Sequence, residues 1–177
     1  MTDEELVRAC LNSNQKAQRK LFEKYSSVMF GVCLRYTSST NDAEDVLQEA
    51  FIKVFSKLDN YSFKGSFEGW IRRIVVNTAL DFIRKNKKMQ LNLSIEDVGY
   101  GLKKNQFVVE DLTAKELMKI IQNIPPGYRT IFNMYAIEGY SHKEIAQQLD
   151  ISENTSKSQL SRARAVIKKL LNENNLI

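Results

Sequence analysis

Apolar residues recur at intervals of three and four along most of this chain, which is the period of an amphipathic helix. The only two prolines are adjacent, at Pro125 and Pro126, so helices elsewhere are free of proline breaks. The pattern therefore predicts an all-α fold. Helices are expected at about residues 6–11, 14–37, 42–58 and 67–88, with further helices between about 110 and 171. In the second helix the expected inward residues are Leu21, Phe22, Tyr25, Val28, Met29, Val32 and Tyr36.

The helical period fails between about residues 89 and 109, where short apolar pieces alternate with glycines and amides. Such a stretch is typical of a flexible linker. We therefore expect two small helical domains, at 1–90 and 110–177, and a linker at 91–109. A chain of 177 residues is long enough to bury two small cores. At the start of the second domain the expected inward residues are Leu112, Leu117, Ile120, Ile121 and Ile124.

Residues 139–171 have the pattern of a helix-turn-helix. Ser141 and Glu144 are spaced as a capping box at the start of a short helix. After a corner at Asp150, Ser152 can cap a second helix that runs to about Leu171. This order of cap, corner and helix is the order that a DNA-reading unit needs.

The charged residues of the second helix are all basic, with five Lys or Arg and no acid between residues 154 and 171. Its small, polar and basic residues gather opposite the apolar stripe, as expected of a helix in a DNA major groove. The alternative is a solvated basic face on an ordinary helical hairpin. By periodicity Ser158, Ser161 and Arg162 face outward, and Lys157 sits at the edge of that face.

The predicted helix at 42–58 carries acids near its start, where Asn41 is the expected N-cap. Asp42, Asp45 and Glu49 recur at i, i+3 and i+7, with Glu44 and Gln48 alongside. Two interpretations stay open on spacing alone. The acids can offset the helix macrodipole, or they can form a docking face for a basic protein surface.

A Gly- and Ser-punctuated loop with four aromatic residues follows at 61–70. Phe67 and Trp70 continue an apolar helical stripe, so we expect them in the core. Tyr61 and Phe63 lie outside this stripe and are the better candidates for contact. With Lys64 beside them, they can stack exposed bases.

The helix that follows this loop has a polar face. Arg73, Asn77, Asp81 and Arg84 line up on it, with donors for phosphates and with donors and acceptors for base edges.

Composition argues against a metal-binding, disulfide-bonded or membrane protein. The net charge of +5 is mild, and the separation of acids at 41–50 from bases at 71–90 favours one surface for a polyanion and another for a protein. Cys10 and Cys33 fit reduced core residues, and one His with no CxxC pair gives no metal site. We expect no cofactor, no membrane insertion and a cytoplasmic location.

These parts together resemble the extracytoplasmic-function group of the sigma-70 family, bacterial RNA polymerase sigma factors, over nearly the full chain. DAEDVLQEAFIKVF at 42–55 resembles the core-polymerase-binding helix, and FKGSFEGWIRRIVVNTALDFIRK at 63–85 resembles the minus 10 region. Residues 124–164, IPPGYRTIFNMYAIEGYSHKEIAQQLDISENTSKSQLSRAR, resemble the minus 35 region.

The resemblance implies a non-enzymatic sigma factor that binds core RNA polymerase and directs promoter-specific initiation on duplex minus 35 and melted minus 10 DNA. An anti-sigma factor is the further partner that it implies. Polymerase contact falls on Asp42, Glu44, Asp45, Gln48 and Glu49. Minus 10 contact falls on Tyr61, Phe63, Lys64, Arg73, Asn77 and Arg84, and minus 35 contact on Lys157, Ser158, Ser161, Arg162 and Lys168.

The chain also departs from the family pattern. Asn154 and Ser156 replace a glycine and an apolar anchor that the family often has in the reading helix. Asp81 places an acid where a neutral or basic residue is common, which leaves two alternatives for it: contact with minus 10 DNA, or an ion pair with Arg84 or Lys85. The rival functions are a dimeric regulator of the response-regulator output type and a nuclease or deaminase that acts on melted DNA.

Overall fold

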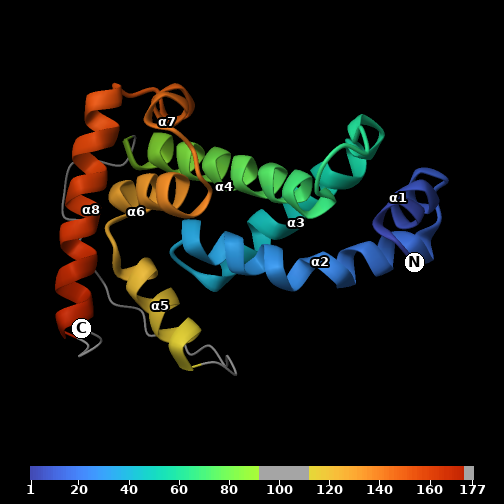
Figure 1. The fold of residues 1–177 in the computed structure, drawn as a ribbon, viewed down its shortest axis with the longest axis horizontal. Coiled ribbons are helices and arrows are strands. Elements are labelled where there is room, and N and C mark those ends of the chain that lie inside the picture. Colours follow the sequence, from blue (N-terminus) through green and yellow to red (C-terminus); the bar gives the residue numbers. More distant parts are fainter. Residues whose placement is uncertain (92–111, 174–177) are drawn as a thin grey trace. The chain divides into compact units, whose positions relative to one another are not determined.

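The computed structural model describes residues 1–91 and 112–173, and every regular element in those ranges is helical. The all-α fold is confirmed. The chain divides into two compact units, which confirms two helical domains (Figure 1). The predicted linker at 91–109 lies outside the described residues apart from Leu91, the last residue of a helix. The domain boundaries therefore stay a prediction.

The first unit contains α1 (Asp3–Leu11), α2 (Gln15–Tyr36), α3 (Thr40–Ser56), the short 3-10 helix η1 (Leu58–Asn60) and α4 (Phe67–Leu91). Helices α2, α3 and α4 pack against one another in pairs, and α1 packs on α2 (Figure 1). The centre of the packing is fully buried, with Leu21, Met29, Val46, Ile71 and Leu80 among its largest side chains. Burial of such side chains is the main driving force for this unit.

Two expectations for the first unit are wrong. Phe22 and Val28 are exposed, because the buried stripe of α2 is narrower than the apolar pattern. The rings of Phe22 and the buried Phe51 meet edge to face, with the centroids 4.8 Å apart. The N-cap of α3 is Ser39, whose hydroxyl accepts from the amide of Asp42 at 3.1 Å, so Asn41 already lies in the first turn.

The second unit contains α5 (Leu112–Asn123), α6 (Pro126–Phe132), the π-helical turn η2 (Asn133–Ile137), α7 (His142–Leu149) and α8 (Glu153–Glu173). Helices α5, α6 and α7 all pack on α8 (Figure 1). Pro126 occupies the first helical position of α6, where its missing amide hydrogen costs nothing. Leu117, expected inward, is 51% exposed on α5, whereas Ile120 and Ile124 are buried as expected.

No helix in the described ranges is long and apolar enough to span a bilayer.

Candidate nucleic-acid interface

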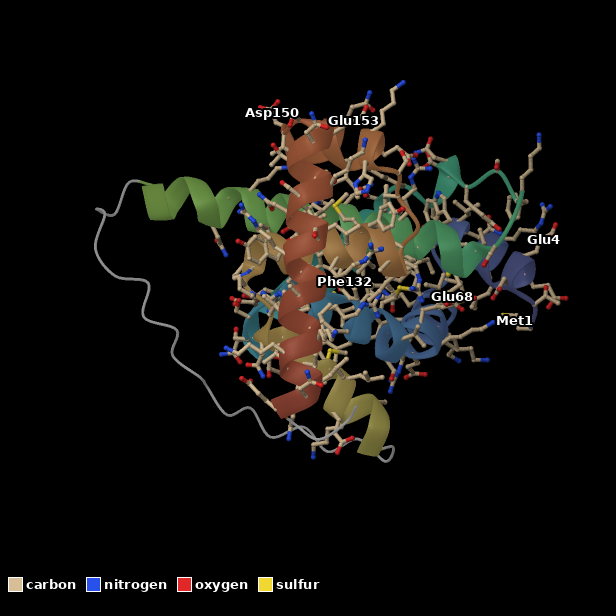
Figure 2. The ribbon with its side chains drawn as sticks, turned by 60° about the vertical axis from the view of Figure 1, so that its left-hand side comes forward. Met1, Glu4, Glu68, Phe132, Asp150 and Glu153 are labelled. Carbon is tan, nitrogen blue, oxygen red and sulfur yellow. The ribbon has the colours of Figure 1, made fainter. Side chains whose placement is uncertain are left out.

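The helix-turn-helix forms at the predicted residues. Ser141 caps α7 through a complete capping box: its hydroxyl accepts from the amide of Glu144 at 3.2 Å, and its own amide donates to the Glu144 carboxylate at 2.8 Å. Asp150 makes the corner in the left-handed region (φ 54°), a conformation that Asp tolerates better than most residues. Ser152 caps α8, accepting from the amide of Thr155 at 3.0 Å. Figure 2 shows Asp150, the corner residue, and Glu153, the first residue of α8, at the same end of α8.

The outward face of α8 is as predicted. Leu160 and Ala163 are buried on the inner side of the helix. The residues predicted to contact minus 35 DNA are all exposed: Lys157, Ser158, Ser161, Arg162 and Lys168. Their placement fits a helix that presents donors to a groove, while their contact with DNA stays a prediction.

A polar contact that the sequence pattern did not predict joins α7 and α8, the two helices of the helix-turn-helix. The hydroxyl of Ser156 on α8 is fully buried and lies 2.9 Å from Nδ1 of His142, the first residue of α7. The His142 ring stacks on Tyr135, with centroids 4.5 Å apart and planes 21° apart. Where an apolar anchor was expected to be lost, a hydrogen bond and a ring stack hold the corner instead.

The acidic face of α3 is only partly free. Glu44, Asp45 and Gln48 are exposed, and Asp42 and Glu49 are half-buried. Glu49 binds Lys53 one turn further along, with Oε1 2.8 Å from Nζ. This hydrogen bond is the main reason that the pKa of Glu49 is below its ordinary value.

On α4, Arg73 and Arg84 are exposed and Asn77 is half-buried. Asp81 accepts from Arg84 at 2.7 Å, which confirms that this acid holds Arg84. Asp81 also lies 3.7 Å from Nζ of Lys53 on α3. The Lys53–Asp81 ion pair therefore joins the acidic face of α3 to the basic face of α4.

The expectation that Tyr61 is free for contact is wrong. Its side chain is buried, with 8% exposed, among the rings of Phe63, Phe67 and Trp70, and its hydroxyl donates to the carbonyl of Gly65 at 3.1 Å. This hydrogen bond between Tyr61 and Gly65 closes the loop, and the Tyr61 ring packs inward. Phe67 is buried as expected, whereas Trp70, also expected in the core, is only half-buried.

Phe63 stays available at the tip of this loop. It is 40% exposed and adopts φ 57°, a conformation that is strained for an aromatic residue. The guanidinium of Arg8, from α1, lies 5.1 Å from its ring centroid, within the range of a cation–π contact. Arg8 is 55 positions away in the sequence, and no periodic pattern in the chain could have linked it to this loop. Lys64 beside it is exposed.

Within the described residues, no group of three or more His, Cys, Asp or Glu side chains is placed to hold a metal ion. Cys10 and Cys33 are both buried and free, as predicted. Burial raises the pKa of the Cys33 thiol to about 12, so it stays protonated at neutral pH.

Both units match known protein families. Residues 21–89 match the family described as Sigma-70 region 2, and residues 114–167 match the one described as Sigma-70, region 4. The ECF RNA polymerase sigma-E factor of Haemophilus influenzae is 30% identical over 178 residues, which cover 94% of this chain and 94% of that protein. The chain belongs to the extracytoplasmic-function (ECF) group of the sigma-70 family.

Other ECF relatives are similar over the same extent. The ECF sigma factor SigW of Bacillus subtilis is 29% identical, with 94% of this chain and 95% of that protein covered. The sigma-E factor of Escherichia coli K12 is 29% identical, with 94% and 93% covered.

Solved structures share the fold. CnrH, in complex with the cytosolic domain of CnrY, has a TM-score of 0.52 and 22% identity over 97% of both chains. The sigma factor RpoE from Bartonella quintana, in complex with the anti-sigma factor NepR, has a TM-score of 0.55 and 20% identity over 87% of this chain and 96% of that one.

Proposed function

We propose that this chain is a promoter-specificity subunit that binds core RNA polymerase and directs transcription initiation at its own promoters. The observation that carries the proposal is that one chain holds both sigma-70 regions. The first unit offers an acidic face on α3 and a basic face on α4, and the second offers a capped helix-turn-helix with a polar, basic outer face.

Polymerase docking is assigned to α3. Asp42, Glu44, Asp45, Gln48 and Glu49 form the contact surface, and its acids suit a basic partner. Ile52 continues this face one turn after Gln48 and is 70% exposed. An exposed apolar residue beside an acidic rim is the composition of a protein–protein contact more than of a solvated helix.

Minus 10 recognition is assigned to the loop and to α4. Phe63 can stack an unpaired base, at about 1–3 kcal/mol per base, while Lys64, Arg73, Asn77 and Arg84 contact the strand. Because Tyr61 is buried, it supports the loop instead of contacting DNA: its hydroxyl bonds to Gly65, and its ring packs against Phe63.

Minus 35 recognition is assigned to α8. Lys157, Ser158, Ser161 and Arg162 lie toward the start of the helix, which is the end that reaches base edges in helix-turn-helix proteins. Lys168 lies further along and contacts phosphate, which is a sequence-independent contribution to affinity.

The remaining assignments follow from the family. The chain makes and breaks no bond, since polymerase supplies the chemistry, and it acts in the cytoplasm where polymerase is. An anti-sigma factor is a further partner; CnrH and the Bartonella quintana RpoE were each solved with a bound protein, the latter with an anti-sigma factor. The rival dimeric regulator predicts tight operator binding without polymerase and leaves the acidic face of α3 without a partner.

The test is transcription in vitro. Core polymerase is given fragments of the source genome with and without the full chain, and RNA start sites are mapped. We expect a small set of starts that appear only with the chain and share sequence upstream. Starts that are identical with and without the chain would sink the proposal, and tight duplex binding in the absence of polymerase would favour the dimeric regulator.

A further inference from the structure

Four charged side chains of alternating sign form a continuous line across α3 and α4. Glu49 Oε1 lies 2.8 Å from Lys53 Nζ, Lys53 Nζ lies 3.7 Å from Asp81 Oδ2, and Asp81 Oδ1 lies 2.7 Å from Arg84 NH1. One end of the line is an assigned polymerase contact, and the other end is an assigned minus 10 contact. The two interior residues have no assigned role.

Lys53 is shared unequally between its two carboxylates. It is within hydrogen-bond distance of Glu49 but is too far from Asp81 for a direct bond. Helices α3 and α4 pack against each other, so the backbones at Glu49, Lys53 and Asp81 stay in place. The side chain of Lys53 is the part that can move. A shift of about 1 Å in its long, flexible side chain is enough to exchange one carboxylate for the other.

We propose that Lys53 and Asp81 are positioning residues that couple polymerase docking to DNA binding by exchanging ion-pair partners. In the free chain Lys53 is paired with Glu49, and Asp81 is paired with Arg84. A basic group of polymerase that binds Glu49 displaces Lys53, which then binds Asp81. Asp81 holds Arg84 through Oδ1, and the charge of Lys53 at Oδ2 weakens that ion pair, so Arg84 transfers more readily to a DNA phosphate. This inference rests on the proposed function of α3 and α4 and adds the link between them.

The coupling works in both directions, as equilibrium linkage requires. DNA that takes Arg84 leaves Asp81 to attract Lys53, and the freed Glu49 then binds polymerase more readily. All four side chains are partly exposed, with 31–46% of each accessible. Exposed ion pairs are weak, so the coupling is modest, about two- to fivefold in affinity. The charge of Lys85 makes a smaller contribution than Lys53 to the lowered pKa of Glu49, and Lys85 takes no part in the exchange.

The first experiment needs no polymerase. Glu49→Gln removes the carboxylate that holds Lys53 and so mimics docking. The probe is fluorescein-labelled oligothymidylate, because the Arg84 contact is to phosphate and does not depend on sequence. We expect the full-length Glu49→Gln chain to bind this probe about two- to fivefold more tightly than the wild type.

Two controls separate the exchange from a general charge effect. Glu44→Gln removes the same charge from the same helix but from outside the line, so it gives only the smaller general gain. In a Lys53→Met background the extra gain from Glu49→Gln disappears, because no lysine is left to move to Asp81. The proposal is overturned if Glu44→Gln equals Glu49→Gln, or if the extra gain persists with Lys53→Met.

The second experiment measures the reverse direction. Arg84→Ala leaves Asp81 to draw Lys53 from Glu49, so the variant binds core polymerase about twofold more tightly although it has lost a DNA contact. Lys16→Ala, an equal loss of charge on an exposed site of α2, leaves core affinity unchanged. Equal core affinity for the two variants overturns the coupling. Thermal unfolding of each variant shows that the helical fold is retained.

The two proposals fail separately. If the wild-type chain gives no new start sites, the proposed function fails whatever the oligothymidylate affinities are. If start sites appear but Glu49→Gln behaves like Glu44→Gln, only the exchange of partners is wrong.

Discussion

The outer face of α8 and the facing surfaces of α3 and α4 are both charged, but they hold their charges differently. In the described part of the chain, Lys157, Arg162 and Lys168 on α8 take part in no ion pair. Glu49 and Arg84 in the first unit are both paired with residues of their own unit. Under the proposed function, α8 binds with donors that are already unpaired, whereas the first unit exchanges internal partners for external ones.

This difference fits the substrates that the two units are assigned. Duplex DNA presents its groove and phosphates without rearrangement, so a rigid helix with unpaired donors suffices. A promoter strand is melted within the polymerase complex, and under the proposed exchange the first unit binds single strands less well before it docks. Substitutions on α8 should then simply remove contacts, while substitutions in the first unit should also redistribute them.

The largest expected effect is on polymerase binding. Asp45→Lys combined with Glu49→Lys places like charges against a basic partner, at a cost of several kcal/mol, so core affinity should fall by about a hundredfold or more. Competition with labelled wild-type chain for core polymerase measures it. Glu23→Lys with Asp59→Lys makes the same change of net charge at exposed sites of the same unit. Equal losses from the two pairs would mean that α3 is not the docking face.

Next in size is Arg162 on the reading helix. Arg162→Ala should cost about 1–3 kcal/mol on the preferred minus 35 sequence and little on a scrambled one, if the guanidinium reads a base edge. Holoenzyme binding to the two duplexes, at one salt concentration, measures the difference. A loss of the same size on both sequences would show that Arg162 contacts only the backbone.

The corner of the helix-turn-helix should be sensitive to His142. His142→Ala leaves the buried Ser156 hydroxyl without its partner and removes the stack on Tyr135, which should lower the free energy of unfolding of the second unit by about 1–3 kcal/mol. Urea denaturation of the full chain, followed by circular dichroism, measures it. In a Ser156→Ala background the same change should cost less. An undiminished cost there would mean that the hydrogen bond does not stabilise the corner.

The smallest expected effect is at Lys168. Lys168→Ala should weaken all sequences alike and lower the slope of log affinity against log salt by about 1, because one phosphate contact is lost. A salt titration of DNA binding by the holoenzyme measures this slope. Selective weakening of the preferred sequence by Lys168→Ala would place the reading face of α8 further along the helix than proposed.

Sequence patterns predicted the local features of the fold well. The capping box at Ser141, the corner at Asp150 and the cap at Ser152 depend on residues within four positions of one another, and all three form as expected. The outward face of α8 follows from helical period alone. Similar reasoning missed the N-cap of α3, because the polar run from Ser38 to Asn41 contains several residues able to cap and periodicity does not choose between them.

Contacts between distant segments were beyond the sequence pattern. His142 meets Ser156 across the corner, Arg8 reaches Phe63 from another helix, and Lys53 approaches Asp81 across the α3–α4 packing. Tyr61 was misplaced for the same reason, since its burial depends on the rings of Phe67 and Trp70 and on where the loop turns. Each of these depends on tertiary packing, which fixes where side chains of different elements meet.

The most direct test of the account is whether the chain opens DNA at minus 10 only together with core polymerase. Permanganate, which modifies unpaired thymines, is applied to a promoter found by start-site mapping, with core alone, chain alone, or both. The account predicts reactive thymines around minus 10 only when both are present, and loss of that reactivity with Asp45→Lys and Glu49→Lys. Reactivity with core alone, or a chain that binds with core and leaves the thymines paired, would contradict it.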